Sequence, residues 1–543
     1  MKKKRAKKRR LFTKQKKQIT ISVEKIQALI DRVGMSNLSD EDKDFIRIAI
    51  EMLEDLNIAI DEKRLQLKIL KDALYGNQSE TSEKTLKNPP VQEKKKTRKK
   101  RESGKNGADA YKGAKHISIS HPELKPGDLC PMCLKGKVCR RKKPSRLIRI
   151  TGNTPLSATV YECEYLRCSL CEAFFKAEPP DDIAPDKYDE RSKAMIVILK
   201  YGSGFPFYRL EKLQDMFEVP MSDSTQWDRV KEVARPCTNI FEELICRSAL
   251  ANLYYADDTG VKILNPGSRL LDTKNKESPK RKGLYTSAIL CEVGDVKIAL
   301  YFSGNRYAGE NLDGVLGKRP DNLEKPLCMS DGSSNNEPKD AEIIDVKCNV
   351  HARRYFVKLI HLFPDECTYV IKALAEVYKN DKVTKDRNMT PRGRLLYHKE
   401  HSTEIMDDLK SYLENLFSDK KVEPNSSLGK AIKYMLKRWE KLTRFLHIEG
   451  VPLDNNICEQ MIKRAVLHRK NSMFYKTRYG AYVGDMMMSI IHTCYLNRIN
   501  PFNYLVALQE NEERVAANPS DWLPWNYESN LPAKPIDLQM APQ

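Results

Sequence analysis

Two acidic residues follow short apolar segments in the middle of the chain. Asp257 comes after Leu-Tyr-Tyr-Ala and precedes Asp258, and Asp331 comes after Leu-Cys-Met-Ser and precedes Gly332. The apolar segments are predicted strands, so each carboxylate would lie at the end of a core strand. Carboxylates placed in this way can hold two divalent cations about 3.5–4 Å apart, which promote phosphoryl transfer.

The expected ions are two Mg²⁺ (or Mn²⁺) per site, because Mg²⁺ prefers oxygen ligands and keeps several waters. Alternation along the strand does not decide between Asp257 and Asp258, because the residues on both faces are apolar. A single Asp at a strand end is more often a turn former than a catalytic residue.

A second chemistry is predicted from cysteine spacing. Cys130 and Cys133 form one CxxC pair, and Cys168 and Cys171 form a second. Two such pairs supply the four thiolates that a tetrahedral zinc site needs. Four thiolates leave no open coordination position, so the zinc would be structural. We expect a β-hairpin between the pairs, with Val160 and Tyr161 as strand residues. A redox dithiol is the alternative, and Cys139 or Cys163 could replace one of the four ligands.

The charge of the chain indicates a polyanionic partner. The 543 residues carry a formal net charge of +21, and each Lys or Arg near a phosphate releases condensed counterions. Double-stranded DNA is the expected partner, and a merely soluble basic protein is the alternative. The expected phosphate contacts include a dense basic block formed by Lys94, Lys95, Lys96, Arg98, Lys99, Lys100 and Arg101.

The same features predict the cellular location. No apolar run reaches the roughly 18 residues of a membrane span, and the basic first 18 residues lack the apolar stretch of a secretory signal. We therefore expect a cytoplasmic, nucleoid-associated protein that does not bind membranes.

A helix is predicted to begin at Ser39, with Asp42 completing a capping-box-like start, and to end at Gly76. Its apolar residues follow a heptad pattern from Ile46 to Leu74, interrupted by Lys63. The pattern favours a coiled coil that mediates self-association. The alternative is a single amphipathic helix packed on the body of the protein.

These elements predict an α+β multidomain protein. Strands are expected at 253–256 paired with 261–264, at 287–293 paired with 296–302, and at 327–330 and 346–350; helices dominate from about 351 to 510. The expected organisation is a basic tail (1–38), a coiled-coil helix (39–76), a basic linker (77–124), a zinc module (125–178), a helical DNA-binding-like region (179–250), a catalytic core (251–500) with a helical insertion at about 360–450, and a C-terminal tail (501–543).

Four segments resemble motifs of the IS66 family of transposases. They are YADDTGVKIL (255–264), LCMSDGSSNN (327–336), CNVHARRYF (348–356) and PLDNNICEQMIKRAVLHRKNSMF (452–474). The resemblance implies a DDE transposase with a ribonuclease-H-like core whose catalytic residues are Asp257, Asp331 and Glu459. Glu459 lies on a predicted helix (454–468) with Asp454 as its N-cap. Asp454 is the main rival as third metal ligand. The non-functional alternative is a solvated Glu459 that pairs with Lys463.

The implied reaction is metal-dependent hydrolysis at a transposon end, followed by attack of the freed 3′-hydroxyl on target DNA. Further phosphate contacts are expected from His351, Arg353, Arg354, Lys463, Arg464, Arg469 and Lys470, with His468 nearby; a solvated basic face is the alternative. A dimer or larger assembly is expected, and accessory proteins encoded beside the transposase are a further possible set of partners.

The sequence departs from the family pattern near the acids. Tyr255 stands in place of the usual His, Asp258 in place of Glu, Ser333 in place of an aromatic residue, and Gln460 in place of Arg. None of these changes removes a triad acid, although flanking phosphate contacts are put in doubt. The rival functions are a non-catalytic, domesticated or decayed DNA-binding relative, and a two-metal nuclease that acts on RNA or repair structures.

Overall fold

The computed structural model describes residues 31–35, 38–49, 52, 63, 124–129, 131–132, 135, 137, 154–167, 174–178, 186–265 and 283–531. The four predicted zinc ligands, the basic block at 94–101 and most of the predicted coiled coil lie outside these residues. Two compact units are formed, one by residues 1–86 with 158–543 and the other by residues 87–157.

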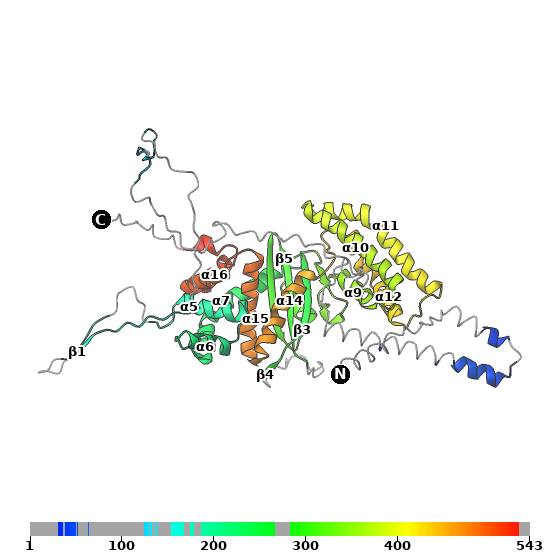
Figure 1. Ribbon diagram of the computed structural model, residues 1–543, viewed down its shortest axis with the longest axis horizontal. Helices are drawn as coiled ribbons and strands as arrows, with labels where there is room; N and C mark the ends of the chain where they lie inside the picture. Colours follow the sequence, from blue (N-terminus) through cyan, green and yellow to red (C-terminus); the bar gives the residue numbers. More distant parts are fainter. Residues whose placement is uncertain are drawn as a thin grey trace. The chain divides into compact units, whose positions relative to one another are not determined.

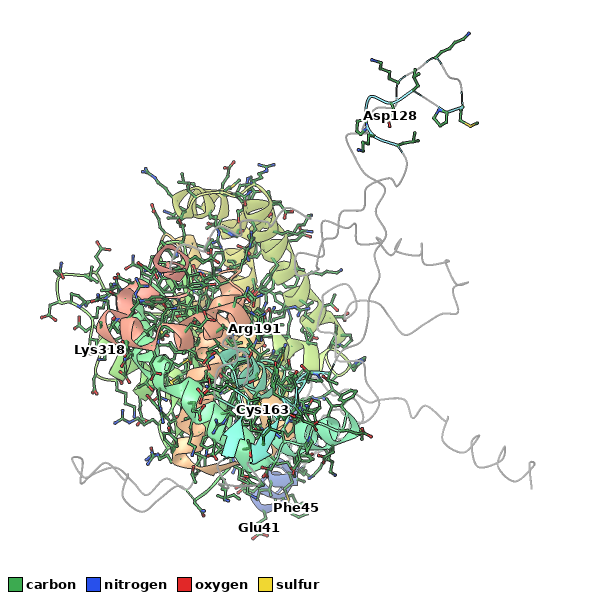
Figure 2. All side chains as sticks on the ribbon, turned by 90° about the vertical axis from the view of Figure 1, so that its left-hand side faces the viewer. Glu41, Phe45, Asp128, Cys163, Arg191 and Lys318 are labelled. Carbon is green, nitrogen blue, oxygen red and sulfur yellow. The ribbon has the colours of Figure 1, made fainter. Side chains whose placement is uncertain are left out.

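The predicted start of the N-terminal helix is confirmed. Residues 40–49 are helical, and the Ser39 hydroxyl accepts a hydrogen bond from the backbone N–H of Asp42 at 3.2 Å. Phe45 on this helix is 74% exposed, and Figure 2 shows its side chain standing out from the ribbon. In the 87–157 unit, Leu129 forms an isolated antiparallel bridge with Lys137.

A five-stranded mixed sheet lies at the centre of the larger unit, in the order β6-β5-β3-β7-β8 (Figure 1). Its strands are β3 (Leu253–Gly260), β5 (Tyr285–Val293), β6 (Val296–Gly304), β7 (Leu327–Ser330) and β8 (Ile344–Lys347). β3, β5 and β6 are antiparallel neighbours, whereas β7 and β8 run parallel to β3. The predicted hairpin turn at Gly294-Asp295 is confirmed, with Gly294 at φ 58°.

Three strand predictions are wrong. β3 continues through Asp257 and Asp258 to Gly260, because β5 pairs with it along its whole length. The following strand, β4 (Ile263–Asn265), pairs in parallel with β9 (Tyr475–Thr477) instead of with β3. β8 ends at Lys347, and the chain then enters α9 at Asn349.

The expected hairpin between the cysteine pairs also differs. Val160 and Tyr161 are exposed and lie outside any strand. The hairpin is formed further on, where β1 (Tyr165–Arg167) pairs with β2 (Phe174–Lys176).

Helices surround the sheet and continue beyond it. They are α5 (Glu190–Val197), the π-helix η2 (Ile198–Gly202), α6 (Phe207–Met216), α7 (Asp223–Ser248), α8 (Ala308–Leu316), α9 (Asn349–Leu359), α10 (Pro364–Asp386), α11 (Pro391–Ser418), α12 (Ser427–Lys437), α13 (Trp439–Leu442), α14 (Asn456–Ser472), α15 (Arg478–Leu496), α16 (Pro501–Glu510) and α17 (Glu512–Ala517). Among the described residues, none of these helices is both long and apolar enough to cross a membrane.

The outer edge of β6 is covered by α15. The edge N–H groups of alternate β6 residues donate to a stripe of α15 side chains spaced four residues apart: Lys297 to Asn497, Ala299 to Thr493, Tyr301 to Ser489 and Ser303 to Asp485. The spacings match because four helical residues rise about 6 Å and two strand residues about 6.8 Å. The helix thus satisfies an edge that would otherwise be open to pairing with another chain.

Asp485 at the end of this stripe predicts a pH-dependent stability. Burial raises the pKa of Asp485 from its ordinary 3.8 to about 7, although the hydrogen bonds from Ser303 act in the opposite direction and lower it. A raised folded-state pKa contributes stability that is present below the unfolded value and is lost as pH rises through about 7. We expect Asp485→Asn, which stays neutral, to gain in unfolding temperature relative to the native chain as the pH rises from about 4 to about 7, and to keep that gain above pH 7.

Thermal unfolding of both chains across this range measures the difference. Asp295→Asn, in the exposed β5–β6 turn, is the matched control and should track the native chain. Parallel curves for Asp485→Asn and the native chain would contradict the prediction.

Candidate active site

The register of two neighbouring parallel strands brings the first two acids together. Leu253, Tyr254 and Tyr255 of β3 pair with Leu327, Cys328 and Met329 of β7. Continuing the same register by two residues sets Asp257 opposite Asp331. Residues two apart share a face of a sheet, and neighbouring strands lie about 4.8 Å apart. Asp257 and Asp331 therefore lie side by side, just beyond the last paired residues.

The pKa of Asp257 is affected by the two other acids. It is half-buried, and burial together with the negative charges of Asp331 and Glu459 raises its pKa to about 7, although the backbone N–H of Asp258 donates to its Oδ1 at 2.8 Å. Carboxylates that share a site in this way resist simultaneous ionisation unless a cation compensates them. The three acids predicted from the sequence thus lie close enough for the charges of Asp331 and Glu459 to act on Asp257.

Asp258 points to the opposite face of the sheet. The Ser287 hydroxyl donates to its Oδ1 at 2.6 Å, and the backbone N–H of Ala308 at the start of α8 donates to its Oδ2 at 2.8 Å. Burial raises its pKa to about 6. Both oxygens of Asp258 thus hold protein donors that anchor α8 to the sheet, whereas α14 packs on the face that carries Asp257.

Asp331 begins a tight turn. Its Oδ1 accepts hydrogen bonds from the Ser333 N–H and from the Asn336 side chain, both at 2.8 Å. The next residue, Gly332, lies against Tyr434 of α12, and a Cβ at this position would be 1.9 Å from the tyrosine hydroxyl oxygen. Only glycine fits there without displacing Tyr434, so the insertion packs directly against the acid-bearing turn.

Tyr434 is itself held on two sides. The ring of Tyr355 lies 4.6 Å from it and the guanidinium of Arg438 lies 4.1 Å from its centroid. Arg438 also donates to the carbonyl oxygen of Gly332 at 2.9 Å. Tyr434 and Arg438 could not be predicted as part of the site, because nothing in the local sequence signals their contact with a turn about a hundred residues earlier.

Glu459 lies in the first turn of α14, and a buried asparagine fixes the start of that helix. Asn455 donates through its side chain to the Ala256 carbonyl oxygen at 3.1 Å and through its backbone N–H to the Cys348 sulfur at 3.3 Å. The helix begins at Asn456, so the prediction that it begins at Asp454 is wrong. Asp454 folds back instead and accepts from the Asn456 N–H at 3.0 Å.

The Glu459 carboxylate faces α9. Its Oε1 lies 3.5 Å from His351 Nε2 and its Oε2 lies 3.4 Å from a guanidinium nitrogen of Arg354. Its side chain is 18% exposed, which does not fit the alternative of a solvated glutamate paired with Lys463. His351 and Arg354 therefore lie at the acids, while Arg353 on the same helix is buried.

Two sets of side chains could hold a metal ion. Potential ligand atoms of Cys348, His351 and Glu459 all lie within 4.8 Å of one another. Burial raises the pKa of the Cys348 thiol to about 12, and a neutral thiol is a poor ligand because metals bind the thiolate. The three acids supply the hard oxygen ligands that Mg²⁺ prefers, but among the described residues their ligand atoms are not gathered within 4.8 Å of one another as those of Cys348, His351 and Glu459 are.

The basic residues after Glu459 occupy different environments. Lys463 and Lys470 are exposed. Arg469 donates to the Thr259 hydroxyl at 3.0 Å and to the carbonyl oxygen of Gly260, so it ties α14 to β3. Among the predicted phosphate-contacting residues that the structure describes, the two lysines are the exposed ones.

Arg464 and His468 are engaged in aromatic contacts. The Arg464 guanidinium lies 4.9 Å from the centroid of the Tyr495 ring. His468 is buried and stacks between Tyr201 and Tyr475, with ring centroids 5.7 and 5.1 Å away. Burial lowers its pKa to about 3, so His468 is a neutral core residue and does not belong to the basic cluster.

A buried lysine at the end of β8 contacts the last residue of β7, just before Asp331. Lys347 is 2% exposed, donates to the Ser330 hydroxyl at 2.9 Å, and forms ion pairs with Glu337 at 2.6 Å and Asp345 at 3.0 Å. Fully compensated buried charges of this kind hold a fixed local arrangement. Lys347 carries no local signal of this role, because it lies within the short predicted strand at 346–350.

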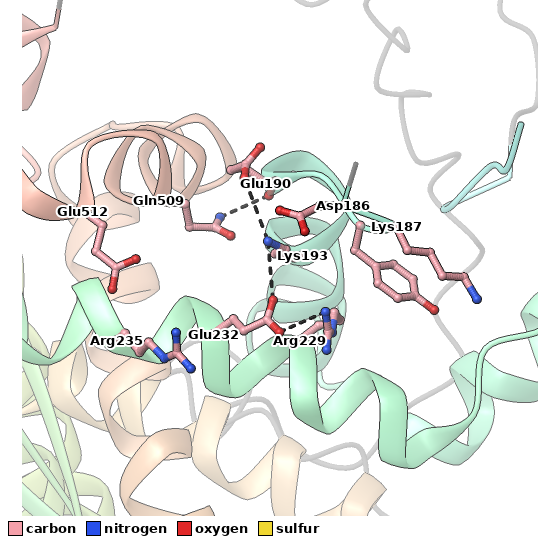
Figure 3. Close-up of a pocket in the computed structure, with 10 residues that line it drawn as sticks. Asp186, Lys187, Glu190, Lys193, Arg229, Glu232, Arg235, Gln509 and Glu512 are labelled. Carbon is pink, nitrogen blue, oxygen red and sulfur yellow. Dashed lines mark hydrogen bonds and ion pairs between the residues drawn. The ribbon is translucent and has the colours of Figure 1, made fainter. Parts of the chain in front are cut away.

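An open pocket elsewhere does not contain the acids. It is lined by residues of α5, α7 and the α16–α17 region, including Lys193, Arg229 and Glu232 (Figure 3). Lys193 lies 3.4 Å and Arg229 2.9 Å from Glu232. These opposite charges satisfy one another, so the pocket is an ion-paired surface recess with no catalytic constellation.

Residues 187–482 match the sequence model of the family described as the IS66 family of transposases. The chain is also similar to two uncharacterized proteins of Sinorhizobium fredii. It is 26% identical to y4jD over 355 residues, which cover 62% of this chain and 66% of that protein. It is 23% identical to y4hP over 390 residues, which cover 67% of each. The chain thus spans about two-thirds of the length of these relatives.

Two solved structures show a weak likeness. The Mos1 mariner paired end complex with Mn is 13% identical, with 50% of this chain and 81% of that chain covered and a TM-score of 0.10. A pre-cleavage Mos1 transpososome is 13% identical, with coverages of 51% and 82% and a TM-score of 0.11. Unrelated folds also reach TM-scores this low, so neither likeness establishes the fold of this chain.

The Asn455 bridge predicts that two adjacent asparagines differ sharply in importance. We expect Asn455→Ala to lower the free energy of unfolding by about 1–3 kcal/mol, because it removes the side-chain donor to the Ala256 carbonyl oxygen of β3. Asn456→Ala is the matched control, since Asn456 is exposed, and should stay within about 0.5 kcal/mol of the native chain. Chemical denaturation of both variants measures the difference, and equal losses would contradict it.

Proposed function

Because the chain belongs to the IS66 family of transposases, we propose that it cuts and joins DNA with a metal site formed by Asp257, Asp331 and Glu459. The observation that carries the proposal is the matched register of β3 and β7, which sets Asp257 beside Asp331. The raised pKa of Asp257, caused by burial and by the charges of Asp331 and Glu459, supports a shared cation site.

The fold supports the same assignment. A mixed sheet with two acids on neighbouring parallel strands, and a third on a helix packed over them, agrees with the ribonuclease-H-like core that the family resemblance implies. Two bound Mg²⁺ or Mn²⁺ ions would activate the attacking oxygen and stabilise the departing one during hydrolysis and strand transfer. Asp258 is assigned a structural role, because Ser287 and Ala308 occupy its oxygens.

Glu459 completes the site by a side-chain movement. Its oxygens contact His351 and Arg354 on α9, so the carboxylate would turn from α9 toward the two aspartates in order to hold an ion with them. His351 and Arg354 would then lie beside the site. Both side chains suit contacts with the phosphates that flank the cleaved bond.

The substrate and the assembly follow from the same proposal. The duplex partner is transposon-end and target DNA, attracted by the net charge of +21. Two ends must be processed together, so a dimer or larger assembly is expected. The predicted coiled coil at 39–76 is the proposed contact, and accessory proteins of the same element are proposed partners. A non-catalytic DNA-binding relative is the alternative.

Replacing single acids tests the proposed reaction. We expect Asp257→Asn, Asp331→Asn and Glu459→Gln each to lower metal-dependent cleavage of a duplex carrying the gene's own flanking ends by about 10²–10³-fold or more. Each should also weaken Mn²⁺ binding measured by calorimetry. Asp454→Asn, which removes the rival third ligand, is the control and should keep both properties.

The outcomes separate the candidate functions. Salt-sensitive DNA binding with no cleavage by the native chain, and unchanged binding in the three variants, would favour the non-catalytic alternative. Cleavage of RNA or branched repair structures in preference to the flanking ends would favour a two-metal nuclease that is not a transposase.

The zinc prediction has its own measurement. We propose that Cys130, Cys133, Cys168 and Cys171 bind one structural Zn²⁺, on the strength of their spacing alone. Elemental analysis of the purified chain is expected to give one zinc per molecule, lost in Cys130→Ser and Cys168→Ser. Cys163→Ser should retain it, and loss of zinc from Cys163→Ser instead would reassign one ligand.

A further inference from the structure

The family motif continues beyond Glu459 with residues that catalysis does not use. The chain from 460 to 484 contains six Lys or Arg residues and no Asp or Glu. In the structure this stretch covers most of α14, all of β9 and the start of α15. β9 pairs in parallel with β4, so a short two-stranded ribbon forms at the C-terminal end of α14.

Met473 connects α14 to this ribbon through an unusual backbone conformation. It has φ 67° and ψ −43°, and the N–H of Phe474 donates to the carbonyl oxygen of Ser472 at 2.8 Å. A γ-turn with positive φ at its central residue is rare and strained. Glycine is the usual residue where a helix ends at positive φ, yet here the position carries a large apolar side chain.

The side chains around this turn are open to solvent. Met473 is 70% and Phe474 42% exposed, and Lys470 and Lys476 beside them are exposed as well. Exposed Lys262 adjoins them, because its carbonyl oxygen accepts from the Tyr475 N–H at 2.9 Å. We call these five residues the ribbon surface: Lys262, Lys470, Met473, Phe474 and Lys476.

The turn is held firmly from beneath. Tyr475 is buried and stacks on His468 at 5.1 Å. The buried Lys200 amine donates to the Ser472 hydroxyl at 2.8 Å. Strained backbone persists where the surrounding structure enforces it, and such positions cluster at functional sites. The structure therefore keeps two apolar side chains exposed at a fixed place between three lysines.

We propose that the ribbon surface binds the DNA duplex next to the active site, with Met473 and Phe474 as an apolar wedge against a base step. This inference rests on the proposed transposase function. Lysines contact phosphates, and Met and Phe are among the side chains that partly unstack base steps. A second copy of the chain fits less well, because a two-fold contact of this surface would place lysines against lysines.

The helix sets the distance from the chemistry. Glu459 and Ser472, the last residue of α14 before Met473, are separated by thirteen residues, which rise about 20 Å. With the duplex aligned along α14, at about 3.4 Å per base pair, the wedge meets it about six base pairs from the phosphodiester at the acids. The interior of the recognised end, rather than its terminal base pair, is thus the part that contacts the ribbon surface.

Site-specific crosslinking tests the location. In the full chain carrying Glu459→Gln, so that DNA stays uncut, Phe474 is replaced by photoreactive p-benzoylphenylalanine. The probe is a 50-base-pair duplex with the flanking-end sequence. We expect crosslinks to DNA about six base pairs from the end, and none from the same substitution at Leu396, an exposed position on α11. A crosslink from position 474 to a second protein chain, or equal DNA crosslinking at both positions, would overturn the proposal.

A backbone-matched pair of variants tests the wedge. Met473→Gly removes the side chain and relieves the strain, so we expect an unchanged or higher unfolding temperature together with about tenfold weaker binding to the flanking-end duplex. Asn388→Gly, at another positive-φ position (49°), should bind as the native chain does. Native binding by Met473→Gly would overturn the proposal.

The phosphate contacts have a separate readout. Log affinity falls as log salt rises, and each phosphate contact contributes about 0.9 to the steepness of that fall. The double variant Lys262→Ala with Lys476→Ala should therefore make the fall less steep by about 1.8. An unchanged slope would overturn the assigned contacts. All three measurements use uncut DNA. Crosslinking at the expected place without cleavage by the native chain would therefore reject the proposed catalysis and leave the ribbon surface standing.

Discussion

The candidate site depends on a short parallel pairing between β3 and β7. Only three residue pairs, from Leu253–Leu327 to Tyr255–Met329, carry it. A slip of one residue would turn the side chain of Asp331 to the other face of the sheet, away from Asp257. The neighbouring strands resist such a slip, because β5 pairs with all eight residues of β3 and β8 pairs with all four of β7.

The helix α14 extends this constraint in two directions. At its start, Asn455 binds the carbonyl oxygen of Ala256, one residue before Asp257, so Glu459 is placed relative to the acid-bearing strand. Near its end, Arg469 binds Thr259 and Gly260 at the end of the same strand. A helix attached at both ends to one strand behaves as a rigid spacer, which links the acids to the ribbon surface at a fixed separation.

The electrostatics of the site reflect competition between burial and charge. Burial and neighbouring carboxylates raise the pKa of Asp257, which makes the ionised site unfavourable without a compensating cation. The Arg354 guanidinium compensates Glu459 from α9, and His351 lies beside the same carboxylate; Tyr434 and Arg438 lie against the Asp331 turn. Residues at and just after the end of α12 thus form part of the wall of the candidate site, although they lie about a hundred residues after Asp331.

Local chemistry was readable from the sequence. The β5–β6 turn at Gly294, the helix start at Ser39 and the strand before Asp331 depend on neighbouring residues, and the family motifs named the three acids. Contacts between distant segments were not readable. The family motif already pointed to Asp257, whereas the contacts of Asp258 with Ser287 and Ala308 on other elements appear only in the structure. The same holds for the pairing of β4 with β9 and for the contact of Arg354 with Glu459, 105 residues away. Periodicity and capping report which element forms, whereas partners across the fold are decided by which side chains the packed sheet and helices bring within reach.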